Sequence, residues 1–173
     1  LYIGICQAAE AGADIINISM AAYRPSGAGL LEQAVHAAVE KGIFVTAAAG
    51  NAGKNVRDYC PANIEGVIAV SAADTNKVIA PYSNRGEQIR YAAYGTVRTT
   101  GLGGADRTIS GTSASTAVVT AAVAACRGQN PDKINNAILE VLDQAAEDLG
   151  TPGRDDCYGN GLLVPENYPV SEE

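Results

Sequence analysis

The chain has 173 residues, of which 47% are hydrophobic and 18% charged, with a formal net charge of -7 and a pI near 4.7. This length and composition predict one folded domain and exclude a disordered chain. The absence of any concentrated run of Lys and Arg excludes nucleic acid as a partner. No apolar stretch reaches the roughly 20 residues of a membrane-spanning helix, which predicts a soluble chain without a membrane partner.

The two ends and the cysteines limit the interpretation further. Residues 1–20 contain no basic segment, start Met or small-residue cleavage site, so we expect no signal peptide and a domain that begins upstream. The spacing of the cysteines argues against a zinc or thioredoxin-type site, and two disulfides in any of three pairings or free buried thiols fit it equally. The four are Cys6, Cys60, Cys126 and Cys157.

Helical and strand-like patterns alternate in the first part of the chain. Residues 2–11 have a helical period that stops at Gly12, and the β-branched run at 14–19 then predicts a buried strand. After a loop at 21–29, apolar residues recur at helical spacing from Leu30 until Gly42. A second buried strand is predicted at 43–50.

The alternation continues to the carboxyl end. A polar loop at 51–63 precedes strands predicted at 67–74 and 89–93. A helix is predicted from Thr112 to about Arg127, and another over 130–150, with Pro131 at its start and Gly150 at its end. Such alternation is typical of an α/β fold with a mainly parallel sheet flanked by helices. The last three residues are expected to fray.

Ser113 lies in the stretch "SGTSASTAVV", just ahead of a long apolar run. Serine and threonine are favoured helix caps, so the stretch is explained by a helix start without any chemistry. A serine in the first turn of a buried helix also lies at the positive end of the helix dipole, where developing negative charge is stabilised. The stretch by itself leaves both interpretations open.

A second polar side chain follows a buried strand in "AAAGNAG", where Asn51 stands between Gly50 and Ala52. Sites in α/β proteins usually lie at the carboxyl ends of the strands, and Asn is also a common turn residue. Together with "ADIINISM" upstream and "GADRTISGTSAS" downstream, these segments resemble the subtilisin-like serine proteases, the subtilase family. "YCPANIEGVIAVSAAD", "PYSNRG" and "YGNGLLVPE" extend this resemblance over nearly the whole chain.

The resemblance implies a fold and a set of roles. It implies the subtilisin-like three-layer fold, with residues 1–173 forming the carboxyl-terminal portion of a single catalytic domain whose amino-terminal part is missing. It makes Ser113 the acyl-forming nucleophile, and it makes Asn51 and the Ser113 N–H the donors to the oxyanion. An extended peptide or protein substrate would lie between a cleft strand and a facing pocket wall. The strand residues are Ser19, Met20 and Ala21, and the wall residues are Ala48, Ala49 and Gly50.

The general base and its acidic partner are not found in the family's motifs. His36, the only histidine, precedes Ala37 where the family has Gly-Thr, and its place opposite the apolar stripe of its helix predicts a solvent-facing side chain. Asp14 opens a strand and precedes Ile15, so it is interpreted as noncatalytic. The Asp and His are therefore expected from an upstream segment or from a partner chain. Without its base, the serine of this chain alone should be nearly inactive.

Other serine mechanisms fit less well. An α/β-hydrolase needs a histidine after the nucleophile, and none follows Ser113. A chymotrypsin-like order would require an all-β chain. A Ser-Lys dyad stays open, without a motif to support it. Its candidate bases are Lys41, Lys54, Lys77 and Lys133.

Two departures from the family's pattern favour a different class of function. Ala21 and Ala22 stand where the family usually has two glycines, and Ala117 stands where it usually has proline. The alternative is therefore a noncatalytic module that binds peptides or proteins, and a purely structural domain is a third. Nucleotide binding at 101–106 is not expected, because this glycine-rich run does not join a strand to a helix with the full glycine fingerprint.

No cofactor is required by this chemistry, and no metal ligand set is identified. Subtilases often bind calcium, but the sequence contains no Asp-rich loop that would locate an ion. An extracellular or extracytoplasmic location is implied only by the habit of the family.

Overall fold

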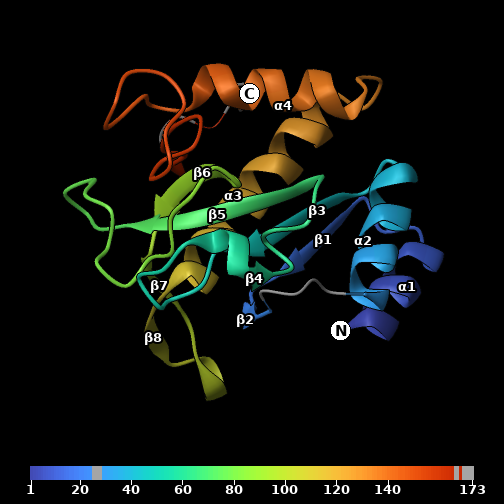
Figure 1. Cartoon of the computed structure of the whole chain (residues 1–173), viewed down its shortest axis with the longest axis horizontal. Helices are drawn as coiled ribbons and strands as arrows, with labels where there is room; N and C mark the ends of the chain where they lie inside the picture. The colour runs from blue at the N-terminus through green and yellow to red at the C-terminus, as the bar shows by residue number, and fades with distance from the viewer. Residues whose placement is uncertain (25–28, 166–167, 169–173) are drawn as a thin grey trace.

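The computed structural model describes residues 1–24, 29–165 and 168. The tail expected to fray, residues 171–173, and part of the loop predicted at 21–29 lie outside these residues. A four-stranded parallel sheet forms the centre, in the order β1-β3-β5-β6 (Figure 1). Its strands are β1 (Ile15–Ile18), β3 (Phe44–Ala48), β5 (Val67–Ala73) and β6 (Ile89–Tyr94). The predicted α/β class and parallel sheet are therefore confirmed.

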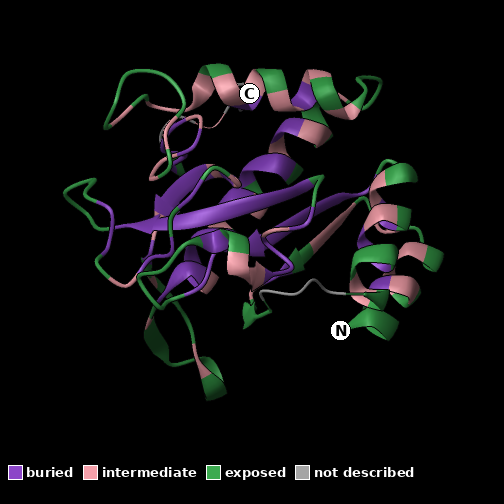
Figure 2. Ribbon diagram, viewed as in Figure 1, coloured by how far each residue is buried: buried purple, intermediate pink, exposed green. Residues whose placement is uncertain are grey.

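Alternate residues of the central strands face two separate hydrophobic cores, because successive side chains of a strand point to opposite sides. One core packs the sheet against α1 (Tyr2–Glu10) and α2 (Leu30–Glu40), through residues such as Val35 and Val45. The other packs it against α3 (Thr112–Gln129) and α4 (Asn135–Ala145), where Val119 and Leu142 are fully buried. The molecule thus has three layers, and the sheet is the most deeply buried of them (Figure 2).

Two small antiparallel sheets lie outside the central one. In the first, β2 (Ala22–Tyr23) pairs with β4 (Tyr59–Cys60), which follows the short 3-10 helix η1 (Val56–Asp58). The second is a hairpin of β7 (Thr96–Thr100) and β8 (Asp106–Ser110), whose connection contains η2 (Leu102–Gly104). This hairpin projects from the body of the molecule (Figure 1) and leads directly into α3.

The sequence did not predict the hairpin. Its residues are mostly exposed on both faces, so they show no alternation of apolar and polar side chains. The glycine-rich run at 101–106 therefore connects two strands, and not a strand to a helix as a nucleotide-binding loop would.

The boundaries of α4 also differ from the prediction. The helix begins at Asn135, because Pro131 lies in a turn closed by the hydrogen bond from the Lys133 N–H to the Asn130 carbonyl. It ends at Ala145, because the backbone of Glu147 pairs with that of Leu162 in both directions and cannot continue the helix.

All four cysteines are free thiols, so neither of the two disulfides left open by the sequence forms. Cys60 and Cys126 are buried. Burial raises the pKa of both thiols above the ordinary value, which keeps them protonated near neutral pH. In the described part of the chain, no helix is long and apolar enough to cross a membrane.

Candidate active site

Ser113 lies in the first turn of α3, beside the carboxyl end of β1. Its hydroxyl does not cap the helix, because the N-cap residue is Gly111, which has no side chain. The Ser113 Oγ instead donates to the Ser19 carbonyl at 2.9 Å, and the Ser19 Oγ donates back to the Ser113 carbonyl at 3.1 Å. The helix-cap explanation of Ser113 is therefore wrong, and its half-buried hydroxyl is held at the rim of the sheet.

Asn51 is fixed next to this turn through one end of its amide. Its Oδ1 accepts two hydrogen bonds, both at 2.9 Å, from the N–H and the hydroxyl of Thr112. The Nδ2 therefore faces Gly111, where a Cβ would lie only 3.1 Å from it. Gly111 has φ 131°, which favours glycine, so this approach of the amide to the backbone requires that residue.

The backbone N–H groups at the start of α3 complete this arrangement. The Thr112 N–H donates to Asn51, and the Ala114 N–H donates to the Gly111 carbonyl. The first N–H groups of a helix have no intrahelical acceptor, so the Ser113 N–H is left to point outward at the positive end of an 18-residue helix. This N–H and the Asn51 Nδ2 can together stabilise a negative charge beside the Ser113 hydroxyl.

Asn84 holds the segment that carries Asn51, and the sequence analysis missed it. This fully buried side chain accepts from the N–H groups of Ala52 (3.1 Å) and Lys54 (2.9 Å) through its Oδ1. Its Nδ2 donates to the Ala49 carbonyl at 2.7 Å. Its own N–H donates to the Gly50 carbonyl. In the sequence, Asn84 lies in the polar run "PYSNRG". Such a run does not indicate whether its Asn is buried and holds a loop or is exposed in a turn.

The predicted cleft residues lie on two segments that flank Ser113. Ser19, Met20 and Ala21 follow β1 and belong to no strand in the structure, although residue 19 was predicted as the end of one. Ala48 ends β3, and Ala49 and Gly50 continue from it in a buried segment. The Gly50 N–H donates to the Thr112 hydroxyl at 3.2 Å, which ties this segment to α3 as well.

The structure brings no histidine or lysine of the described residues to Ser113. His36 lies on α2, which packs against α1 and β3, and its side chain is half-buried where the sequence predicted a solvent-facing one. Asp14 precedes β1 and so lies about 16 Å along the chain from Ser19. The Ser113 hydroxyl has the Ser19 carbonyl as its partner, while the Lys77 Nζ binds Glu147. The Ser-Lys alternative therefore gains no support.

Neither a thiol nor a metal cluster competes with Ser113 as the reactive centre. Cys60, on the strand next to β2, is buried, and its raised pKa keeps it a neutral thiol. Within residues 1–24, 29–165 and 168, no group of three or more His, Cys, Asp and Glu side chains is arranged to hold a metal ion.

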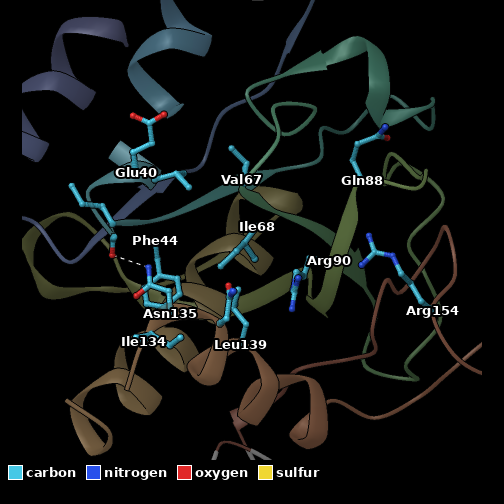
Figure 3. Close-up of a pocket in the computed structure, with 15 residues that line it drawn as sticks. Glu40, Phe44, Val67, Ile68, Gln88, Arg90, Ile134, Asn135, Leu139 and Arg154 are labelled. Carbon is cyan, nitrogen blue, oxygen red and sulfur yellow. Dashed lines mark hydrogen bonds between the residues drawn. The ribbon is translucent and has the colours of Figure 1, made fainter. Parts of the chain in front are cut away.

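A cavity lies at the opposite end of the sheet, around the amino ends of β3, β5 and β6 (Figure 3). It has a volume of about 620 Å³ and apolar walls that include Phe44, Ile68 and Leu139. Both arginines that line it are already engaged, since Arg90 pairs with Asp143 at 2.8 Å and Arg154 donates to backbone carbonyls. No serine lines it.

Comparison with known proteins identifies relatives across this whole region. A sequence model described as the subtilase family matches residues 3–161. A thermostable alkaline protease of Halalkalibacterium halodurans is 39% identical over 150 residues, which cover 86% of this chain and 40% of that protein. Subtilisin BL of Lederbergia lenta is 34% identical over 164 residues, which cover 94% of this chain and 59% of that protein.

Solved structures agree on the fold. A lanthipeptide protease superimposes with a TM-score of 0.87 at 24% identity, over 96% of this chain and 64% of that one. A protease of Pseudoalteromonas arctica superimposes with a TM-score of 0.77 at 27% identity, over 90% of this chain and 50% of that one. The chain thus spans less than two thirds of the length of each of these relatives.

Proposed function

This chain belongs to the subtilase family, and we propose from that premise that it is the nucleophile-bearing part of a serine endopeptidase. The observation that carries the proposal is the first turn of α3, where Asn51 binds Thr112 through its Oδ1 and turns its Nδ2 toward Gly111, next to the residue that carries the Ser113 hydroxyl. A serine that only capped the helix would not need an amide held at this point.

In the proposed reaction the Ser113 Oγ attacks the carbonyl carbon of a peptide bond. The hydroxyl proton passes to a general base as the Oγ–C bond forms, and the carbonyl oxygen becomes an oxyanion. Asn51 and the Ser113 N–H donate to that oxyanion. The base then returns the proton to the leaving amine as the C–N bond breaks, and water releases the acyl group from Ser113 by the same steps.

The general base and its acidic partner come from outside these 173 residues, in an upstream segment or a partner chain. The hydrogen bond from Ser113 to the Ser19 carbonyl supports this assignment, because a carbonyl oxygen holds a hydroxyl proton but does not remove it. An incoming histidine would take over this bond and leave the Ser19 carbonyl open. The segment 19–21, in which Met20 and Ala21 are exposed, could then bind the backbone of an extended peptide.

An active-site phosphonylating reagent tests the proposal. We expect a simple alkyl fluorophosphonate to modify Ser113 in a protein that carries this chain together with its base, and to leave the 173-residue chain nearly unlabelled. Peptide mass spectrometry locates the modified residue. Ser113→Ala should abolish labelling, while the control Ser110→Ala, which changes an exposed serine on β8, should not alter it. Absence of labelling in both forms would remove Ser113 as a nucleophile.

One observation favours a second candidate, a noncatalytic module that binds peptides or proteins. The Ser113 hydroxyl is already paired with the Ser19 carbonyl. A Ser113→Ala variant that keeps full peptide affinity and full biological activity would support the binding module over the enzyme.

The proposal also covers cofactors and the location of the protein. The proposed chemistry requires no cofactor, and a calcium ion, if bound, would be a structural addition. A relative from Bacillus subtilis named minor extracellular protease Epr is 34% identical over 151 residues, which supports an extracellular location for this protein as well.

A further inference from the structure

The two segments that flank Ser113 are both fastened to the first turn of α3, so their separation is fixed. Ser19 exchanges two hydrogen bonds with Ser113, and the Gly50 N–H is bound to the Thr112 hydroxyl. A substrate residue whose carbonyl is attacked by Ser113 must place its side chain between these segments. The width of this space therefore decides which residue the site accepts.

Ala21 fills that space from one side. A Cβ built on Gly50 would lie 3.3 Å from the Cβ of Ala21, which is already a tight contact between two methyl groups. Between the Ala21 methyl and the Gly50 backbone there is thus less room than one methyl group needs. Any larger side chain would have to push the two segments apart.

Asn84 and the Ala21 methyl both lie against the Cβ position of Gly50, and Asn84 holds this segment in place by hydrogen bonds. The Asn84 Nδ2 contacts the position that a Gly50 Cβ would take, and this side chain is fully buried and bonded to the Ala49 carbonyl. Gly50 has φ 104°, so the close passage between Asn84 and Ala21 needs a residue without a Cβ.

The wall on the Gly50 side is closed to solvent. β2 follows Ala21 and pairs directly with β4, and the ring centroids of Tyr23 and Tyr59 in this pair lie 5.6 Å apart, edge to face. Ala48 and Ala49 are 2% and 0% exposed, whereas the wall of an open pocket would be accessible to solvent. The cavity in Figure 3 is lined by none of these residues.

We infer that the residue on the acyl side of the scissile bond is glycine, selected by the methyl group of Ala21. The inference rests on the proposed function and specifies its substrate class, which is an extended peptide cleaved after glycine. Alanine would be accepted poorly, and aromatic or branched residues would be rejected by overlap with Ala21 and with the wall that Asn84 supports.

A series of peptidyl phosphonates that differ only in the side chain next to phosphorus tests the inference. The probes carry glycine, alanine or phenylalanine at that position, and a plain alkyl fluorophosphonate without a side chain is the reference. In the protein that carries this chain and its base, we expect Ser113 labelling to slow by about tenfold from glycine to alanine and by about 100-fold or more to phenylalanine. Equal or faster labelling by the phenylalanine probe would overturn the inference.

Two matched variants assign the effect to one methyl group. Ala21→Gly should raise the phenylalanine-to-glycine labelling ratio by about tenfold or more, because it removes the methyl that touches Gly50. Ala22→Gly removes the exposed methyl of the next residue and should leave that ratio unchanged. An unchanged ratio in Ala21→Gly would contradict the role of Ala21. If even the plain fluorophosphonate fails to label Ser113, the proposed function fails, and the inference fails with it.

Discussion

The two edges of the central sheet differ in two ways: one has a cavity, and the other has the candidate catalytic residues. At the amino edge, around the starts of β3, β5 and β6, lies a cavity of about 620 Å³ whose arginines are bound to Asp143 and to backbone carbonyls. At the carboxyl edge, the segments around Ser113 are in contact, and hydrogen bonds hold them to α3. The proposed reaction therefore uses the hydroxyl and donors at the carboxyl edge, and not the cavity at the amino edge.

The sharpest way to break this comparison is to remove the amide at the carboxyl edge. Asn51→Ala should lower the rate of Ser113 phosphonylation by about 100- to 1000-fold, the size known for loss of the oxyanion-hole Asn in subtilisin, a member of this family. Stopped-time labelling in the protein with its base measures the rate. A loss of less than about tenfold would mean that Asn51 does not reach the oxyanion.

Asn84→Ala tests whether the buried brace acts through Asn51. It leaves two N–H groups and one carbonyl without their partner, so we expect a loss of about 2 to 3 kcal/mol in the free energy of unfolding. The limiting rate of phosphonylation in the folded protein should fall about 10- to 100-fold, because the oxyanion donor is no longer held in place.

Asn63→Ala is the matched control for that brace. Asn63 lies in the turn after β4, and its Nδ2 donates to the Arg57 carbonyl. We expect this variant to lose about 1 kcal/mol or less in stability and none of its labelling rate. Equal effects of the two variants on the rate would show that Asn84 has no special connection to the site.

Tyr91→Phe probes the polar network behind the amino edge. The buried Tyr91 hydroxyl donates to Asp143 at 2.5 Å, and its loss should cost about 1 to 2 kcal/mol of unfolding free energy at pH 7. Burial, followed by the hydrogen bond to Asp143, raises the pKa of Tyr91 above its ordinary value of about 10. The stability of the native chain should therefore be complete below pH ~10 and fall above it, and this fall should be smaller in the variant.

Urea unfolding of both proteins at pH 8 and pH 11 measures this difference. A difference in stability between the two proteins that stays constant across this range would contradict the pH dependence. Labelling of Ser113 at pH 8 should be unchanged, since Tyr91 takes no part in the carboxyl edge.

Arg90→Met should have the smallest effect. The substitution removes the ion pair with Asp143, but Tyr91 and Asn160 still donate to that carboxylate, so we expect a loss of about 1 kcal/mol. The rate of Ser113 labelling should stay the same. A large loss of labelling would show that the amino-edge cavity is coupled to the reaction, against the comparison drawn above.

The sequence predicted the central sheet and the flanking helices well, because their apolar periods are strong and β3 and β5 are buried throughout. The strand at the edge, β1, was predicted to be buried, but only Ile18 of its four residues is. Prediction from the sequence failed in segments that are not packed into a core, because these have no apolar periodicity. The β7–β8 hairpin is exposed on both faces. The start of α4 was predicted too early, because Pro131 fits a turn as well as it fits the first residue of a helix. The half-buried position of His36 also depends on neighbours that its own helix does not reveal.

Within the site, the placement of Asn51 at the carboxyl edge followed from the end of a buried strand, and that of Ser113 near it followed from the resemblance to the subtilases. The pairing of Ser113 with Ser19 and the support from Asn84 did not, because both are contacts between segments far apart in the sequence. Their geometry depends on the finished sheet.

The hairpin that precedes α3 has a practical consequence for engineering. Its base is closed by the hydrogen bond from the Gly111 N–H to the Gly95 carbonyl, while Leu102 at its tip is 96% exposed. Insertions or deletions at 102–104 should therefore alter only the exposed tip and leave the turn that carries Ser113 in place. An affinity tag, a fluorescent domain or a targeting peptide can be inserted there, so the hairpin is a natural attachment point for cargo on this scaffold.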